Sequence, residues 1–481
     1  MEQRRRVLLV AGFVVLATAA LGVQAAVIDR GPGVQEAADG EVYPGNTLIG
    51  VHSWQNDGSV VEIDPDGEVV WEYGARSGET GPARFFGIDP LLEGDAAPNV
   101  EPENDGDVVL FVYGEIIPAE DCDEEHLRYE ANFAQGPNPQ DHCVLNRVVL
   151  MDRGEDRDRH DVVWEYEWYD EMIHWHEVHD AVVTDEGEVA IIDMGKHRVF
   201  TVDADGEKTW EWHADDHIDQ GTPFFEEHVE GSPHVDDPST FARQGEWDDW
   251  THWNDIVETD EGTFWLSVRN YDMLIEVDPE TDEIVDTIGE AGNKSFVDHQ
   301  HNPQYLEEHG TVVIADSGNN RIIEADMETE EILWSYNGPQ GDPLQWPRDA
   351  DRLPNGNTLI TDSRNNRVLE IDPDGEVVWQ FHDPDGDLIP LPYAADRLPV
   401  GETAGGPSAY QLGTAEERDH GIREDIREAE TLAHWVLPNW MHLPQQLNLL
   451  AIVLGSLWLV GEGVLYGVRR AGVVERLRDR R

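Results

Sequence analysis

Histidine and arginine side chains recur at corresponding places in segments of the chain that repeat. They lie where the first strand of a unit is expected to begin, and this set is His176, His179, His252, His299, His301 and Arg348. The loops expected after second strands carry a further set, Arg269, Asn270 and Arg364. Three histidines are suitable ligands for Zn²⁺ or Cu²⁺. Alternatively, a neutral histidine can act as a nucleophile while neighbouring histidines and arginines stabilise the charge of a transferred anionic group.

These residues also have a purely structural interpretation. A single histidine at such a position is commonly a hydrogen-bonded lining residue, and Asn-Asn-Arg at 319–321 and 365–367 recurs as a turn. However, three units place histidine near one position and a fourth places arginine there. This concentration favours a functional site, because the chain has 101 acidic residues and only 32 basic ones.

The elements that would position these side chains repeat along the chain. The ten residues Glu62–Trp71 recur letter for letter as Glu370–Trp379. A full unit at 346–381 has the pattern of four short strands separated by Gly, Asn and Pro turns, which is one blade of a β-propeller. Matching units are 104–169, 174–214, 249–292 and 298–338. Tryptophans in the outer strands are interpreted as blade packing, and the Asp-Pro-Asp-Gly segments as ordinary turns.

The unit that begins at Gly45 lacks its inner strand. Ala394–Pro399 closely resembles Ala350–Pro354, the inner strand of the preceding unit. We therefore expect 393–401 to join 45–73 in one blade, which closes the ring and removes two exposed sheet edges. The sequence thus predicts an all-β fold, a six-bladed β-propeller over residues 41–401.

One face of such a propeller is formed by the loops before the inner strands and those between second and third strands. The histidines and arginines above map to this face. Three long insertions, 74–103, 114–143 and 215–248, are also expected in its loops. They would suit a lid that excludes water.

Both ends of the chain have the pattern of membrane segments. Arg4–Arg6 precede an apolar run over Val7–Ile28, which predicts a signal-anchor or transmembrane helix over 1–28. A second apolar run, Leu447–Val468, is followed by a basic tail at 469–481. The positive-inside rule then places both termini in the cytoplasm and the propeller outside the cell. Mixed-charge residues 414–437 are expected to form a helical stalk.

The formal net charge is −69, and only three basic residues are lysines. Such a surface repels itself in dilute buffer and is screened at molar salt, so the composition resembles that of proteins from extreme halophiles. The charge argues against nucleic acid as a partner, since phosphate binding requires a basic stripe. The two cysteines, Cys122 and Cys143, lie in one insertion, and an extracellular location favours a disulfide between them.

Three segments resemble the arylsulfate sulfotransferase family, and the chain as a whole resembles a haloarchaeal-type member of that family. The first is His179–Gly187, with a His-Asp strand leading to a glycine turn. The second is His252-Trp-Asn-Asp-Ile-Val with Leu266-Ser-Val-Arg269-Asn after it. The third is Gln300-His301, followed by the strand that begins at Gly310. The resemblance covers about residues 45–400.

The resemblance implies a six-bladed propeller that moves a sulfuryl group from an aryl sulfate to a phenol without a nucleotide donor or other cofactor. It implies that His301 is the nucleophile and forms a transient sulfohistidine, with His299 as the alternative because Asn302-Pro303 follows His301. His179, His252 and Arg269 would hold the sulfuryl oxygens and move the phenolic proton. Two other hypotheses stay open, a non-catalytic sensor or binding propeller and a histidine-ligated metal enzyme.

Overall fold

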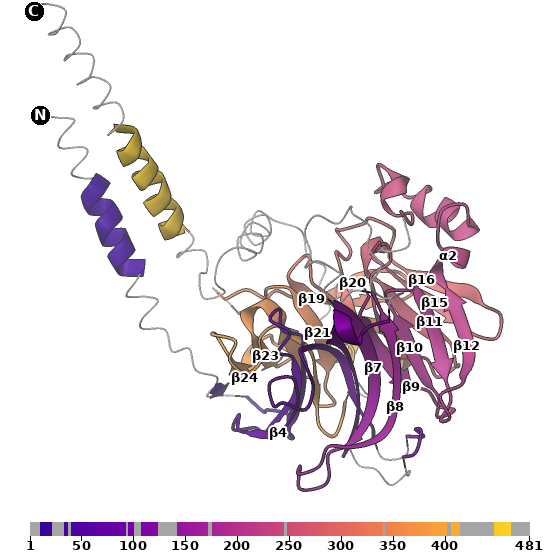
Figure 1. Cartoon of the computed structure of the whole chain (residues 1–481). Coiled ribbons are helices and arrows are strands. Elements are labelled where there is room, and N and C mark those ends of the chain that lie inside the picture. Colours follow the sequence, from indigo (N-terminus) through magenta and orange to yellow (C-terminus); the bar gives the residue numbers. More distant parts are fainter. Residues whose placement is uncertain are drawn as a thin grey trace, which may run out of the picture. The chain divides into compact units, whose positions relative to one another are not determined.

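The computed structural model of the chain is shown in Figure 1. It describes residues 10–21, 33–36, 40–92, 95–100, 107–123, 142–171, 176–244, 248–339, 342–401, 406–413 and 447–462. Contacts divide the chain into two units, one formed by Met1–Arg30 with Ala429–Arg481 and the other by Gly31–Glu428. The expected stalk at 414–437 and tail at 469–481 lie outside the described residues, as do parts of both terminal segments.

The larger unit contains six antiparallel sheets arranged as the blades of a propeller (Figure 1). Blade 1 has β5 (Ala83–Pro90), β6 (Val108–Pro118), β7 (His142–Asp152) and β8 (Asp161–Asp170). Blade 2 has β9 (Val178–Val183), β10 (Val189–Asp193), β11 (Arg198–Val202) and β12 (Lys208–His213). Blade 3 has β13 (Trp253–Glu258), β14 (Phe264–Val268), β15 (Met273–Asp278) and β16 (Glu283–Ile288).

The second half of the ring continues this pattern. Blade 4 has β17 (His301–Leu306), β18 (Thr311–Asp316), β19 (Arg321–Asp326) and β20 (Ile332–Tyr336). Blade 5 has β21 (Pro347–Arg352), β22 (Thr358–Asp362), β23 (Arg367–Ile371) and β24 (Val377–His382), with β1 (Gly33–Glu36) at its outer edge. Blade 6 has β25 (Pro392–Arg397), β2 (Thr47–Val51), β3 (Ser59–Ile63) and β4 (Val69–Gly74).

Blade 6 closes the ring. Its inner strand β25 comes from the C-terminal side of the propeller and pairs antiparallel with β2, with Thr47 opposite Arg397. The six inner strands contact one another in order around the axis, and β25 contacts both β21 and β5. The six-bladed fold expected from the repeats is therefore confirmed.

Two parts of the ring differ from the expectation. The inner strand of blade 1, β5, lies within 74–103, which the sequence assigns to a loop; residues 91–107 separate it from β6, so the short hairpin that marks other inner strands is missing. Strand β1 pairs with β24, Gly33 opposite His382, and extends the sheet before residue 41.

The repeated Asp-Pro-Asp-Gly segments form hairpin turns, as expected. In the turn between β3 and β4 the Asp64 carboxylate accepts hydrogen bonds from the backbone N–H groups of Asp66 (3.0 Å) and Glu68 (2.9 Å). Asp372 does the same between β23 and β24. Gly67 adopts φ +83°, a conformation that side chains with a Cβ rarely take, so the turn requires glycine there.

Buried ion pairs join neighbouring blades. Arg397 of blade 6 lies 2.9 Å from Glu370 of blade 5, and its guanidinium lies 4.9 Å from the Trp379 ring centroid. Arg352 pairs in the same way with Glu324 at 3.0 Å and stacks on Trp334. In a third example, Arg153 pairs with Glu62 and stacks on Trp71. In these three blades the tryptophan of the repeat thus packs against an arginine from the next blade, which explains its recurrence there.

Blade 3 breaks this pattern. It has Asp286 at the place of the tryptophan, and Glu276 of its third strand accepts a hydrogen bond from Thr263 (2.5 Å) within the blade. Trp210 of blade 2 instead donates to the Asp282 carboxylate (2.8 Å) in the neighbouring turn.

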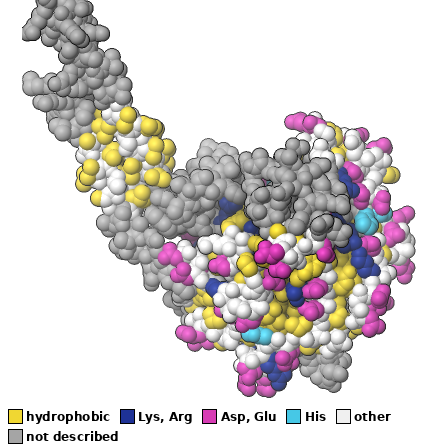
Figure 2. All heavy atoms as spheres, in the orientation of Figure 1, with side chains coloured by type: hydrophobic (Ala, Val, Ile, Leu, Met, Phe, Trp, Pro, Cys, Tyr) yellow, Lys and Arg dark blue, Asp and Glu magenta, His cyan; other side chains and the backbone are white. Residues whose placement is uncertain are grey.

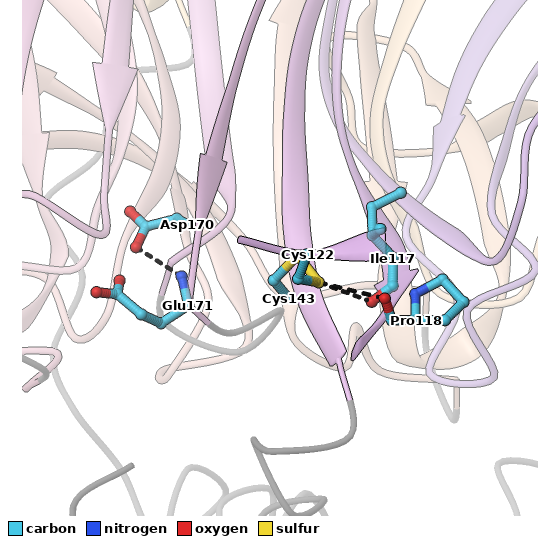
Figure 3. Close-up of a disulfide and its surroundings, with 6 residues drawn as sticks. All are labelled: Ile117, Pro118, Cys122, Cys143, Asp170 and Glu171. Carbon is cyan, nitrogen blue, oxygen red and sulfur yellow. Dashed lines mark hydrogen bonds between the residues drawn. A yellow bond between two sulfur atoms is a disulfide. The ribbon is translucent and has the colours of Figure 1, made fainter. Parts of the chain in front are cut away.

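A disulfide joins Cys122 to Cys143, with 6.1 Å between their Cα atoms (Figure 3). Cys143 is buried in β7, and the Cys122 sulfur lies 3.4 Å from the carbonyl oxygens of Ile117 and Pro118. The expected disulfide is therefore present. It closes the connection between β6 and β7 against its own blade.

Short helical turns lie in the connections. They are η1 (Ala119–Asp121), α2 (Ala214–His217), η4 (Phe225–Val229), η5 (Pro238–Thr240), η6 (Arg269–Tyr271), η7 (Glu307–His309), η8 (Ser363–Asn365) and α3 (Ala409–Leu412). The insertion 215–248 is fastened to blade 3, since the Tyr271 hydroxyl lies within hydrogen-bond distance of the carbonyl oxygens of Ile218 (3.1 Å) and Phe241 (2.9 Å).

The smaller unit contains two helical segments, 10–21 and 447–462. Within it the Asn448 amide donates to the carbonyl oxygen of Ala17 (3.3 Å), and Gly455 lies against Val14. Their visible side chains are mainly hydrophobic, whereas acidic side chains are scattered over the visible face of the propeller (Figure 2). Among the described residues, no helix combines the length and the apolar character needed to cross a membrane.

Six aspartates lie on the inner strands around the axis: Asp255, Asp349, Asp351 and Asp396, which are buried, and Asp89 and Asp180, which are partly buried. Burial raises the pKa of Asp89 to about 7, and it raises the pKa of Asp396 well above the usual value, with neighbouring aspartates adding to the effect. Within the described part of the chain, neither carboxylate oxygen of Asp396 has a hydrogen-bond partner. These groups are therefore protonated in the folded protein under mildly acidic conditions.

This protonation makes stability fall with rising pH. The unfolded aspartates ionise near pH 4 and the folded ones near or above 7, so their contribution is complete below pH 4 and is lost as pH rises through 7 and beyond. We expect the free energy of unfolding of Asp396→Asn to fall less steeply with pH than that of the wild type, by up to about 1.4 kcal/mol per pH unit. Tm measured between pH 6 and 9 at constant molar salt tests it against Asp66→Asn, an exposed turn residue. Equal slopes for both variants would contradict the expectation.

Candidate active site on the propeller axis

Each inner strand carries an irregularity in its pairing near its first residues. The register shifts at this point in all six blades. A β-bulge re-aims the side chain of the extra residue. The residues at these shifts form one set around the axis: Phe86, His179, Asn254, Asn302, Arg348 and Tyr393.

Ring contacts show that side chains of this set converge. The His179 ring centroid lies 4.4 Å from that of Phe86 and 5.8 Å from that of Tyr393. The Arg348 guanidinium lies 5.1 Å from the Tyr393 ring centroid. Side chains from blades 1, 2, 5 and 6 therefore meet at one place.

His252 and His301 complete the cluster from blades 3 and 4. His252 precedes β13, and its ring centroid lies 5.2 Å from that of His179. His301 begins β17, and its ring lies 5.9 Å from that of Tyr393. Asn254, two residues after His252, donates to the carbonyl oxygen of Gln300 (2.9 Å) and so holds the segment that leads into His301.

The three histidines are held in their neutral form. The pKa of His179, of His252 and of His301 is lowered well below the usual value, first by burial. The positive charges of Arg269 and Arg348 lower each of these pKa values further. Arg269 follows β14, so the structure brings together the four residues predicted to be catalytic.

Neither arginine of the cluster forms an ion pair with a described residue; Arg348 is buried and Arg269 is partly buried. No carboxylate of the described residues lies within 4.0 Å of the Arg269 or Arg348 side chain, and Nε of each lacks a hydrogen-bond partner. Burial and the nearby charges of Arg364 and Arg269 lower the pKa of Arg348 to about 9. Buried cations cost free energy unless an anion pairs with them. Their placement in so acidic a chain indicates a site for an anionic group.

The Nδ1 atoms of His252 and His301 have different partners. His252 Nδ1 lies 2.6 Å from Asp249 Oδ2, and burial raises the pKa of Asp249 to about 7. This pair can hold one proton near neutral pH. His301 Nδ1 faces the Ser317 hydroxyl at 2.8 Å and the carbonyl oxygen of His299 at 3.0 Å, and neither is charged.

Two predicted substrate-binding histidines have carboxylate partners. His176 is fully buried, and its Nδ1 lies 2.8 Å from Asp170, which Lys196 also contacts at 3.0 Å. His299 Nδ1 lies 2.5 Å from Asp298. His176 therefore belongs to an ion-pair cluster beside the site. His299 contacts His301 through its backbone carbonyl oxygen and not through its side chain.

The other predicted substrate-binding residues flank the site. Asn270 uses its amide to bind the backbone oxygen of Asp249, so it supports the loop before β13. The Arg364 guanidinium lies 5.4 Å from the Trp346 ring centroid, and the Trp346 ring lies 6.2 Å from that of His301.

The histidine cluster lacks the geometry of a metal site. Within the described part of the chain, three metal-ligating side chains approach within 4.8 Å of one another in two groups only. These are Asp170, Glu171 and His176, and Asp272, Asp298 and His299. In the first, the Lys196 ammonium lies 3.0 Å from both carboxylates and takes the place of a cation.

Sequence reasoning missed four side chains of the site: Phe86, Asp249, Ser317 and Tyr393. One of these had a usable signal. Ala395–Pro399 is identical to Ala350–Pro354, and continuing this alignment toward the N-terminus places Tyr393 opposite Arg348. Asp249 and Ser317 lie in loops, and their contacts with histidine arise only from folding.

Fold and site together define a six-bladed β-propeller with a buried, cationic, histidine-rich centre on its axis. Residues 175–383, which include His179, His252, Arg269 and His301, match the model of the Arylsulfotransferase (ASST) family. The match supports a relationship to the arylsulfotransferases and extends over blades 2 to 5. No curated protein sequence matches the chain.

Solved structures match the chain at low sequence identity and low TM-scores. A protein of unknown function from Bacteroides caccae is 15% identical, covers 73% of this chain and 98% of its own, and has a TM-score of 0.44. A putative 6-phosphogluconolactonase from Bacteroides fragilis is 10% identical, with coverages of 74% and 99% and a TM-score of 0.36. Virginiamycin B lyase from Staphylococcus aureus is 13% identical, with coverages of 53% and 70% and a TM-score of 0.32. At these values the likeness carries no argument about activity.

The buried arginines predict that sulfate binds and stabilises the protein. Exchanging NaCl for Na2SO4 at equal ionic strength should raise Tm, because specific binding adds about 1.4 kcal/mol to the free energy of unfolding when sulfate is at ten times Kd. Sulfate also stabilises proteins nonspecifically, so the readout is the difference from Arg348→Gln. Arg198→Gln is the control, because Arg198 pairs with Asp193 and Glu211 away from the axis. An equal sulfate effect in all three proteins would exclude the anion site.

Proposed function

We propose that the protein transfers a sulfuryl group from an aryl sulfate to a phenolic acceptor through a transient sulfohistidine on His301. The observation that carries the proposal is the convergence of three neutral histidines with Arg269 and Arg348, two arginines that have no carboxylate of the described residues within 4.0 Å. The family match over residues 175–383 supports the same chemistry.

The first half-reaction starts at neutral His301. Its ring nitrogen lone pair attacks the sulfur atom of the donor, an N–S bond forms, and the S–O bond to the aryl group breaks. The electron pair of that bond leaves on the phenolic oxygen, which takes a proton from the His252–Asp249 pair. In the second half-reaction an acceptor phenol returns a proton to this pair, its oxygen attacks sulfur, and the N–S bond breaks. Protons and electrons balance over the cycle.

The remaining groups act on charge and position. Arg269, Arg348 and His179 surround the place where the sulfuryl oxygens would lie, and fixed cations in a dry site stabilise charge more strongly than they do in water. Phe86 and Tyr393 offer ring faces beside His179, which suits an aromatic substrate. Splitting the transfer into two steps avoids the need to bind both phenols in line at once.

We also propose that the propeller works outside the cell at high salt, with both chain ends in the membrane. The disulfide favours an oxidising compartment. In the terminal helical segments large apolar side chains are exposed, among them Leu16 at 72% and Leu457 at 63%. Protease treatment of intact cells, with tags at the two ends and in the propeller, tests the orientation.

Sulfuryl transfer is tested with the full chain at molar salt, 4-nitrophenyl sulfate as donor and a phenol as acceptor. We expect acceptor-dependent release of 4-nitrophenol, and a gain in mass of one SO3 group on His301 when the acceptor is withheld. His301→Ala should abolish both, whereas His299→Ala should retain the covalent adduct. Absence of turnover over a broad donor panel in the folded wild type would leave a binding propeller instead.

The His252–Asp249 pair predicts a dependence on the leaving group. A phenyl sulfate donor needs protonation as the S–O bond breaks, while 4-nitrophenyl sulfate releases a more stable phenolate. We expect Asp249→Asn to lower kcat/KM about 10²-fold or more for phenyl sulfate and less than about tenfold for 4-nitrophenyl sulfate. Asp298→Asn, which removes the similar carboxylate of His299, is the matched control. Equal losses for both donors would show that Asp249 supplies no proton.

A further inference from the structure

Ser317 lies directly behind the proposed nucleophile. It follows β18 of blade 4, it is fully buried, and its hydroxyl oxygen is 2.8 Å from His301 Nδ1. The next residue fixes the loop, because the Gly318 N–H donates to the Asp298 carbonyl oxygen at 2.7 Å. A Cβ at Gly318 would lie 2.7 Å from that same oxygen, so the close approach requires glycine.

The hydrogen bonds around Ser317 determine where its single hydrogen goes. The hydroxyl oxygen is 2.6 Å from the carbonyl oxygen of Pro347, and a carbonyl can only accept. The hydroxyl therefore donates to Pro347 and presents a lone pair to His301. The second neighbour of His301 Nδ1 is the His299 carbonyl oxygen at 3.0 Å, which is also only an acceptor.

We infer that Ser317 is a positioning residue that holds the proton of His301 on Nδ1 and leaves the lone pair on Nε2 for attack on sulfur. This role rests on the proposed function. The opposite tautomer would place the Nδ1 lone pair against a carbonyl oxygen and would require Ser317 to abandon Pro347. Both changes leave buried polar groups unpaired, which is unfavourable.

Ser317 also links the nucleophile to the anion site. Pro347 is the first residue of β21 and directly precedes Arg348, whose guanidinium contributes to the low pKa of His301. The chain of contacts from His301 through Ser317 to Pro347 therefore joins blade 4 to blade 5. It fixes the imidazole relative to the cation that would hold the sulfuryl oxygens.

The contact between the Ser317 hydroxyl and His301 Nδ1 involves no charged group, which suits a nucleophilic histidine. A carboxylate behind His301 would favour the imidazolium, which has no lone pair to attack sulfur. His252, with Asp249 behind its Nδ1, has the environment of a proton carrier. The two histidines thus have opposite roles because the groups behind them differ in charge.

The test compares Ser317→Ala with Ser363→Ala. Ser363 occupies the same place in blade 5, is equally buried, and its hydroxyl has no hydrogen-bond partner among the described residues. We expect Ser317→Ala to lower kcat about 10- to 100-fold with little change in KM, since the fraction of the reactive tautomer falls. Ser317→Thr should restore most of the rate because it keeps the hydroxyl, and Ser363→Ala should match the wild type.

A second readout is independent of activity. In the full chain labelled with ¹⁵N-histidine, the imidazole signals that disappear in His301→Gln identify this ring, and their shifts report which nitrogen carries hydrogen. We expect the Nδ1–H form in the wild type and a mixture in Ser317→Ala. An Nδ1–H form that is unchanged in Ser317→Ala, together with unchanged kcat, overturns the role of Ser317. Wild-type protein that shows this tautomer but no sulfuryl transfer refutes the proposed function alone.

Discussion

The site depends on the closure of the ring at blade 6. Strand β25 pairs with β2, and Arg397 at its end forms a buried ion pair with Glu370 of blade 5. Removing one partner of such a pair leaves a buried charge, so the contact enforces the closed arrangement even if its net contribution is small. The same strand supplies Tyr393, whose ring contacts His179, His301 and Arg348 from three other blades. Closure and the assembly of the site are therefore one event.

Electrostatics divides the axis into two layers with different charge. His179 and Arg348 occupy the bulges at the start of their inner strands, while Asp180 and Asp349 follow them one residue later. Asp180 accepts a hydrogen bond from the Ile256 N–H (3.0 Å) and Asp349 from the Ala395 N–H (2.7 Å), each on another blade. The aspartates thus join inner strands, and no carboxylate of the described residues lies within 4.0 Å of Arg269 or Arg348. Asp249, Asp272 and Asp298 act on Arg269 only from farther away, so an anion bound at the axis could pair directly with both arginines.

The sequence allowed the blades and much of the site to be predicted because both repeat. The copies Glu62–Trp71 and Glu370–Trp379 mark equivalent strands, and the inner-strand starts of three units carry His179, His252 and His301. Strand β5 was missed because Phe86 stands where other units have a polar residue and no hairpin follows. His176 and His299 were placed with the substrate, yet each has an acidic residue within six positions that pairs with it. The contacts of Ser317 and Asp249 join loops of different length, so no repeat encodes them.

The split blade also affects how the protein is made. Blades 1 to 5 can each form from one continuous stretch of chain, but β2, β3 and β4 wait for β25, which follows them by more than three hundred residues of sequence. During synthesis the early strands of blade 6 keep an exposed sheet edge, and such an edge favours pairing with other chains. His179, His252 and His301 would meanwhile lie around an axis without Tyr393. If the proposed function holds, a nascent or prematurely ended chain would therefore be inactive, because the environment of His301 is complete only in a finished propeller.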